Sequence, residues 1–256
     1  MRALRLVLLG LAVFLVGLVA LFPAAPIVDR LRPGLGPVAL EGVSGRAFAG
    51  RVARAASTDD LLPLEFSNVT WRLAPGALPA GGGARVTFEG YGGGGEGLVR
   101  RAWNGDVTVE DFRMDARAKA LEPLLPAPIA EFDGTLDVEL RELALVDGLL
   151  ARVDGRLAWI GATLERPVGV DFGEVEVTVA PEGEALHAGS IEAGGGDVAA
   201  SGTFTLAPNG DYAVDVLVTP AASAPAPVLD ALRRAGRADA QGRYRVRQSG
   251  NVNRLM

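Results

Sequence analysis

The stretch that decides the fold is Leu136-Asp137-Val138-Glu139-Leu140-Arg141, in which apolar and charged residues alternate one by one. Successive side chains of a β-strand point to opposite faces, so this pattern predicts a half-buried strand. The alternation returns at residues 174–179 and 212–218, with shorter examples at 86–88, 107–109 and 244–246. Together these stretches predict a mainly β fold, a long curved and largely antiparallel sheet with one face in water.

A short motif of an apolar residue, a polar residue and glycine recurs along the chain. It reads Phe132-Asp133-Gly134 and Val153-Asp154-Gly155, with looser copies at residues 40–42, 88–90, 200–202 and 240–242. Glycine permits a bulge or a tight bend, so we expect the motif where successive hairpins enter one sheet. Two unrelated β modules with ordinary turn glycines are the alternative. Two short helices are expected at residues 115–125 and 227–235, ending at Pro126 and Gly236.

The N-terminus carries a long apolar run, because residues 6–22 include no polar side chain. Seventeen such residues make a helix of about 26 Å, close to the thickness of a bilayer core. We therefore expect a cytoplasmic tail over residues 1–5, an uncleaved transmembrane helix over 6–25 and a β domain over 26–256. In a Gram-negative cell that domain would be periplasmic. A cleaved secretory signal is the alternative.

Small residues recur every seven positions in this run, at Ala3, Gly10 and Gly17. Their spacing predicts a face of the membrane helix against which a second helix could pack closely. The alternative is that glycine is simply common in membrane helices.

Composition argues against several functional classes. The 256 residues include no Cys and one His, and the net charge is −6. Thiolate chemistry and multi-histidine metal sites are therefore unavailable, and the basic excess typical of nucleic-acid binding is missing. We expect no enzyme activity, no cofactor, no bound metal and no nucleic-acid partner.

The motifs that resemble catalytic or cofactor sites fail in context. Gly92, Gly94 and Gly97 match a dinucleotide-binding pattern, but no βαβ unit surrounds them. The single histidine, His187, lies in an apolar stretch without a companion ligand, so we expect a structural role. Glu174 and Glu176 alternate with valines, which favours a solvated strand face over acid–base catalysis.

Basic residues gather at two places. Arg46, Arg51 and Arg54 form a dense basic stretch, and Arg243, Arg245 and Arg247 alternate along the last predicted strand. The second set predicts a basic strand face that meets an acidic partner. Neutralisation by acidic faces of the same sheet, such as Asp137 and Glu139, is the more ordinary alternative.

Several stretches, in this order, resemble the type II secretion system protein N family of Gram-negative bacteria. After the tail and the apolar segment come residues 40–50 (LEGVSGRAFAG) and 69–75 (VTWRLAP), the latter a tryptophan strand before a proline turn. Residues 121–126 lead into 134–136, then follow a second tryptophan strand at 155–159 and the segment 232–244. Phe48 departs from the tryptophan common in the family.

The resemblance implies an accessory inner-membrane component of the apparatus that exports folded proteins across the outer membrane. Its expected partners are the inner membrane and other secretion components, and no catalytic residues are carried over. The family is also similar to AsmA-type curved sheets, which gives the alternative of a periplasmic lipid-binding or lipid-transfer protein. Such a protein needs an open apolar groove, so the surroundings of Trp71, Trp103 and Trp159 bear on the choice.

Overall fold

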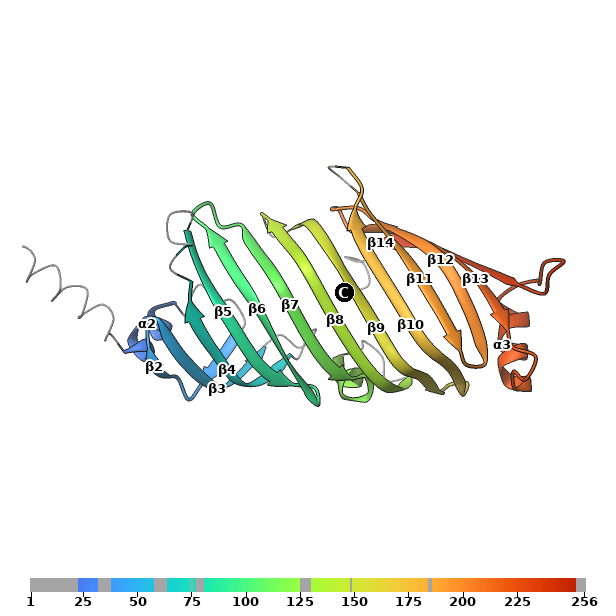
Figure 1. Cartoon of the computed structure of the whole chain (residues 1–256), viewed down its shortest axis with the longest axis horizontal. Coiled ribbons are helices and arrows are strands. Elements are labelled where there is room, and N and C mark those ends of the chain that lie inside the picture. Colours follow the sequence, from blue (N-terminus) through green and yellow to red (C-terminus); the bar gives the residue numbers. More distant parts are fainter. Residues whose placement is uncertain are drawn as a thin grey trace, which may run out of the picture.

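The structure is a computed structural model that describes residues 23–31, 38–57, 64–74, 76, 81–124, 130–147, 149–183 and 186–251. Within these ranges the strands form one fourteen-stranded sheet in which each strand lies beside its neighbours in the sequence (Figure 1). The exception is the short strand β2, which pairs with β3 alone, so that β1 also lies next to β3 in the sheet. The paired strands run antiparallel. The alternative of two unrelated modules is thus excluded, because the sheet is continuous from β1 to β14.

The strands lengthen toward the middle of the sheet, where β9 has 18 residues. Their bounds are β1 Val38–Glu41, β2 Ser44–Arg46, β3 Ala49–Ser57, β4 Glu65–Leu73, β5 Gly81–Gly90, β6 Gly93–Ala102 and β7 Val107–Arg117. The second half comprises β8 Glu131–Val146, β9 Leu149–Arg166, β10 Val170–Pro181, β11 His187–Gly195, β12 Val198–Leu206, β13 Asp211–Pro220 and β14 Tyr244–Asn251.

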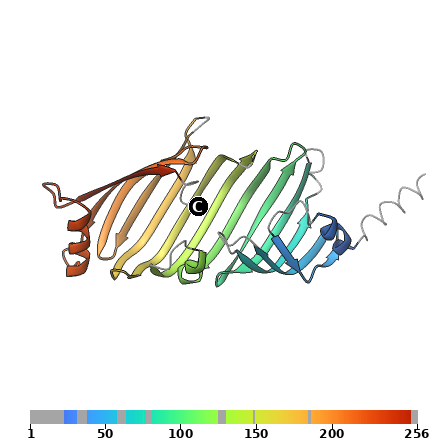
Figure 2. The same ribbon diagram turned by 180° about the vertical axis from the view of Figure 1, so that it is seen from behind.

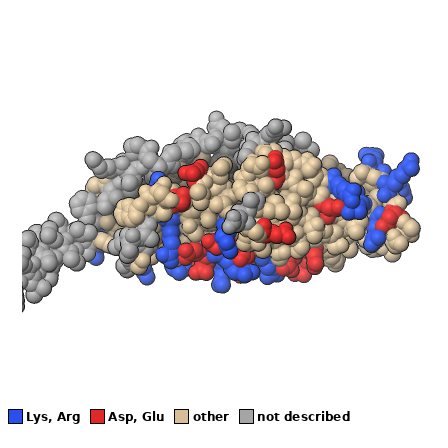
Figure 3. All heavy atoms as spheres, turned by 90° about the horizontal axis from the view of Figure 1, so that it is seen from above, with Lys and Arg blue, Asp and Glu red and all other residues tan. Residues whose placement is uncertain are grey.

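The register sorts the alternating residues onto two faces, as the sequence pattern predicts. Leu136 lies opposite Trp159, which lies opposite Val175 on the next strand. The neighbouring positions Asp137, Ala158 and Glu176 are aligned in the same way and point to the other side. We call these the apolar face and the polar face. Seen from above, most of the charged side chains in view lie along one long side of the molecule (Figure 3).

Aromatic rings lie across the apolar face in two ladders. Phe66 packs edge-on against Phe88 with ring centroids 4.8 Å apart, and Phe88 stacks on Phe112 at 6.1 Å. Further along, Trp159 lies between Phe132 and Phe172, at 5.8 and 6.1 Å. Aromatic pairs at these separations contribute about 0.5–1.5 kcal/mol beyond their buried area, so the ladders help to hold neighbouring strands together.

Several rings cover a glycine that lies directly opposite on the neighbouring strand. These pairs are Trp71 over Gly50, Phe88 over Gly95 and Phe204 over Gly189. A Cβ atom built at any of these glycines would lie within 2.3–2.5 Å of the ring. Glycine is therefore required here, because the flat ring occupies the space of the missing side chain.

The predicted glycine motif lies at a β-bulge in both of its clear copies, since the β8–β9 register shifts opposite Gly155 and Asp154 as well as at Gly134. Gly134 has φ +111°, and the β8–β9 register shifts between Asp133 and Thr135. The prediction was wrong for Gly202, which lies in the middle of β12 at no register shift. There a Cβ would stand 2.4 Å from the Asp215 carbonyl oxygen, so the reason for glycine is close backbone approach.

Among the described residues, three short helices lie at the margins of the sheet (Figures 1 and 2). They are α2 (Ala24–Leu31), the 3-10 helix η3 (Ala118–Leu124) and α3 (Ala226–Ala235). The second matches a predicted helix but begins later than expected, because Asp115 and Arg117 still pair with β8 as the end of β7. The third confirms the prediction, and its Val228 closes a small core with Val170 and Val198.

The predicted fold class was wrong in its transmembrane helix. The described residues include no helix that is long and apolar enough to cross a membrane. Helix α2 overlaps the end of the predicted span, but its eight residues reach only about 12 Å, against about 30 Å of bilayer core. The fold class is corrected to one large antiparallel sheet with a few short helices.

The remaining predictions for the N-terminus concern residues 1–22, which lie outside the described residues. Among them are the proposed packing positions Ala3, Gly10 and Gly17 and the boundary of the tail after residue 5.

Candidate functional site: the polar face of the sheet

The polar face carries a row of adjoining hollows. The largest, about 720 Å³, crosses β8 to β13 and is lined by Asp137, Arg156, Glu174, Glu176 and Glu192 among others. Next to it lies a hollow of about 520 Å³ that includes Glu96, Arg113 and Asp115, followed by one of about 450 Å³ over β2 to β5. A fourth, of about 370 Å³, lies beside β14. These four larger hollows therefore lie on the polar side of the sheet.

Charge varies along this row. The largest hollow is acidic, since four carboxylates line it against the single Arg156, which pairs with Glu176 at 2.7 Å. Glu176 also lies directly opposite Glu192 in the β10–β11 register. Like charges directly opposite each other destabilise a sheet. The negative charge of this part of the face therefore lowers the stability of the fold.

Arg245 and Arg247 of the predicted basic strand lie on the polar face of β14, while Arg243 precedes that strand, and all three contact aspartates of the same chain. Two nitrogens of the Arg245 guanidinium donate to the two carboxylate oxygens of Asp215, Nε to Oδ1 at 2.7 Å and Nη2 to Oδ2 at 2.5 Å. Arg247 donates to Oδ2 of the same carboxylate at 3.1 Å. Hydrogen bonds from Arg245, and then from Arg247, lower the pKa of Asp215 to about 2. Arg243 pairs instead with Asp239 at 2.8 Å.

These contacts agree with the alternative of neutralisation within the same sheet, but the partner is Asp215 and not Asp137 or Glu139, the examples expected from the sequence. Both residues belong to β8, in the middle of the sheet, and Glu139 pairs with Arg113 at 3.9 Å. Asp215 was missed as the partner because 30 residues and helix α3 separate it from Arg245. Only the register, which places Asp215 opposite Arg247, reveals the contact.

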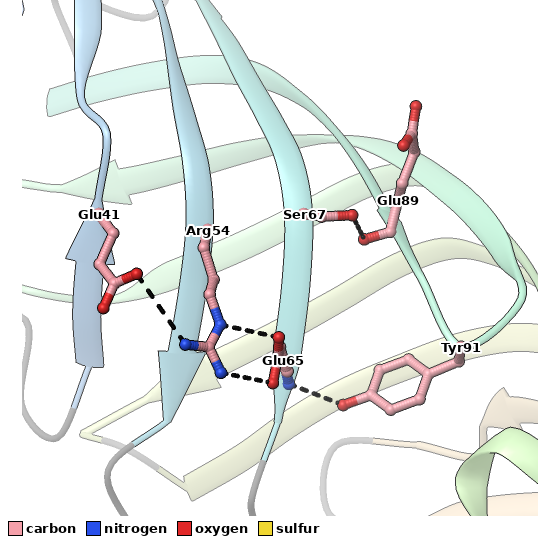
Figure 4. A network of polar contacts seen from close by, with 6 residues as sticks. All are labelled: Glu41, Arg54, Glu65, Ser67, Glu89 and Tyr91. Atoms are coloured by element: carbon pink, nitrogen blue, oxygen red, sulfur yellow. Dashed lines mark hydrogen bonds and ion pairs between the residues drawn. The ribbon is translucent and has the colours of Figure 1, made fainter.

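The N-terminal end of the face holds a second polar network (Figure 4). Arg54 of β3 donates to Glu65 of β4 at 2.7 and 2.8 Å and lies 3.9 Å from Glu41 of β1. The Arg54 hydrogen bond lowers the pKa of Glu65, and the same contact raises the pKa of Arg54. The backbone N–H of Glu65 donates to the Tyr91 hydroxyl at 2.9 Å. The network therefore ties three strands together and compensates the charge of Arg54.

The other two arginines of this basic stretch are placed differently. Arg51 donates to the neutral Oδ1 of Asn68, and Arg46 ends the short β2 strand. Neither forms an ion pair within the described residues. Among the described residues, Arg54 is thus the one member of this basic stretch whose charge is paired with carboxylates.

The tryptophans give the lipid alternative no support. Trp71 donates its indole N–H to the Ala47 carbonyl at 3.1 Å, and Trp159 donates to the Asp133 carbonyl at 2.9 Å. Trp103 is 80% exposed in the turn after β6. The apolar hollow beside Trp159 measures about 190 Å³, below the roughly 300–1,000 Å³ typical of small-molecule sites.

The residues whose motifs resemble catalytic or cofactor-binding sites lie in ordinary structural positions of the sheet. His187 is 2% exposed at the start of β11, with Nδ1 3.3 Å from the Leu206 carbonyl. Gly92, Gly94 and Gly97 belong to the β5–β6 hairpin, where Gly92 has φ +77°. Glu174 and Glu176 lie on the polar face, as predicted. Groups of three or more His, Cys, Asp or Glu side chains able to hold a metal ion are missing from the described residues.

Comparison with known proteins identifies relatives over nearly the whole chain. The family model described as type II secretion system (T2SS), protein N, matches residues 36–247. The chain is 27% identical to the type II secretion system protein N of Aeromonas hydrophila over 253 residues, which cover 95% of this chain and 96% of that protein. No solved structure matches the chain.

Proposed function

The chain belongs to the type II secretion system protein N family, and from this membership we propose that it is an accessory, non-catalytic scaffold of the secretion system. In this proposal the β-sheet lies in the periplasm and assists the export of folded proteins across the outer membrane. Its partners are other components of the same apparatus.

The observation that carries this proposal is the continuous polar face. Its charged side chains are spread over the strands in cross-strand pairs such as Arg156 with Glu176 and Arg245 with Asp215. A catalytic centre needs groups that converge within hydrogen-bond reach of one reacting atom. Dispersed charges on a long continuous sheet instead suit contacts with protein surfaces, where electrostatic complementarity determines the choice of partner.

We further propose that the basic strand of Arg243, Arg245 and Arg247 faces such a partner. β14 is the last strand of the sheet, and residues 245–250 of it are exposed. The Asp215 carboxylate holds the guanidinium groups of Arg245 and Arg247 in place, while both arginine side chains stay more than half exposed to solvent. Two cations held by one carboxylate retain a net positive charge for a partner.

The test is export in a strain that lacks the chain. We expect substrates that have already folded in the periplasm to accumulate there, because the apparatus loses a supporting component. Translocation across the inner membrane should continue unchanged, and restoring the chain should restore export. Unchanged export together with an altered permeability of the outer membrane would contradict the proposal.

A further inference from the structure

The hollow over β2 to β5 differs from the rest of the polar face in its charge. Arginines contribute its only charged lining groups within the described residues: Arg51, Arg72 and Arg85. Thr70 and Thr87 form its polar floor, with their hydroxyls 2.7 Å apart. We call this site the arginine hollow; its volume is about 450 Å³.

Two of these arginines are placed against each other. Arg72 of β4 lies directly opposite Arg85 of β5 in the sheet register. Like charges directly opposite each other destabilise a strand pair. Other arginines of this face pair with a carboxylate, as Arg54 does with Glu65 and Arg156 with Glu176. Arg72 and Arg85 form no ion pair within the described residues.

The third arginine, Arg51, adds a positive charge that is separated from the pair formed by Arg72 and Arg85. Arg51 lies on β3, and its hydrogen bond to Asn68 leaves its charge in place because the acceptor is neutral. β3 and β5 are two strands apart, so the chain positions of Arg51 and Arg85 are separated by at least about 10 Å. The Arg51 guanidinium is held at Asn68, whereas Arg72 and Arg85 lie side by side two residues further along the strands, so the hollow offers positions for two separate carboxylates.

We propose that the arginine hollow binds an acidic segment of a partner protein. One carboxylate lies between Arg72 and Arg85, and a second lies at Arg51. A segment in the polyproline II conformation has three residues per turn and advances about 3.1 Å per residue, so carboxylates three residues apart lie on one face, about 9 Å apart, and match this spacing. Arginine forks bind carboxylates in a bidentate manner, and the threonine hydroxyls supply further donors on the floor. This inference rests on the proposed function, since it requires a component of the secretion system as the partner.

A single substitution separates binding from folding. Arg72→Glu places a carboxylate directly opposite Arg85, so it replaces a repulsive cross-strand pair with an attractive one. The variant should therefore melt no lower than the parent chain. Arg234→Glu is the matched control, because it makes the same change in net charge at an exposed arginine of α3.

The first measurement uses purified full-length chain and a fluorescent synthetic peptide with Glu at every third position in a Gly/Ser background. We expect Arg72→Glu to weaken its binding about fivefold or more and Arg234→Glu to change it less than about twofold. Binding should weaken as salt rises. Equal binding of the matching Gln peptide, or equal weakening by both substitutions, would overturn the proposal.

The second measurement places a photo-crosslinker at Thr87 in cells that contain the secretion apparatus. Crosslinks should map to a segment of a secretion component with two carboxylates about three residues apart, and Arg72→Glu should reduce their yield. Crosslinks to lipid, or to the acidic face of a second copy of this chain, would overturn the proposal. If loss of the whole chain lowers export while Arg72→Glu keeps full crosslinking, this inference fails and the scaffold function stands. If loss of the chain leaves export unchanged, the scaffold function fails.

Discussion

Replacing Gly189 with alanine tests whether the glycines of the apolar face are required by the rings above them. A Cβ at Gly189 would lie 2.3 Å from the Phe204 ring and 2.3 Å from the Thr178 carbonyl oxygen, where ordinary contacts begin at 3.4 Å. The ring has some freedom to rotate, but the carbonyl belongs to β10, the neighbouring strand in the ladder. Overpacking of this kind costs about 1–3 kcal/mol.

The matched control lies in the same strand. Gly194 is on the polar face opposite Glu174, and a Cβ there would have nothing within 4 Å. Alanine at such a site stabilises a protein by about 0.4–1 kcal/mol, because the unfolded chain loses conformational freedom. The two variants make the same chemical change, so their difference isolates the effect of Phe204 and the Thr178 carbonyl.

The assay is thermal unfolding of the purified chain, followed by far-UV circular dichroism. For a chain of this size the melting temperature moves by roughly 2–4 °C per kcal/mol, so Gly189→Ala should melt about 2–12 °C lower. Gly194→Ala should melt at the parent temperature or slightly above it. If Gly189→Ala melts as high as Gly194→Ala, the close packing of rings on glycines is refuted.

Three further predictions concern side-chain contacts. The pKa of Asp215 is lowered to about 2 in the folded chain from an ordinary 3.8, so its contribution to stability is present above about pH 4 and is lost as pH falls toward 2. Asp215→Asn should therefore lower the melting temperature at pH 7, and this difference should shrink between pH 4 and 2; a constant difference would argue against the ion pairs. Trp159→Phe keeps the aromatic ladder but removes the hydrogen bond to the Asp133 carbonyl, which should cost about 1 kcal/mol in denaturant titration; no change in the midpoint would show that the bond contributes nothing. Arg72→Glu should melt at or above the parent temperature at low salt, an effect that 1 M salt should diminish; a lower melting temperature would mean that Arg72 supports the fold in some other way.

The sequence predicts the strands and their faces well because the pattern is local. Alternation within Leu136–Leu140 is sufficient to place Asp137 and Glu139 in water, and the register confirms that assignment. Helix α3 is also predicted, since Gly236 and the preceding arginines end it by local chemistry. The local pattern does not show which strands are neighbours in the sheet or how their residues are aligned.

The candidate site depends on that missing information. Arg72 and Arg85 belong to different strands, and nothing in their spacing shows that they lie directly opposite each other. The same holds for Asp215, which meets Arg245 across an intervening helix. Helix α2 was missed as well, because its first residues, Ala24 and Ala25, were assigned to the end of the apolar run.

The proposed function requires that partners contact the polar face of the sheet and not its apolar face. Thr203 and Phe204 are neighbours in β12 that point to opposite faces, so photo-crosslinkers at these two positions in cells compare the faces directly. We predict crosslinks from Thr203 to other secretion components and none from Phe204, whose ring lies on Gly189. Crosslinks from Phe204 to lipid, with none from Thr203 to protein, would contradict the proposed function.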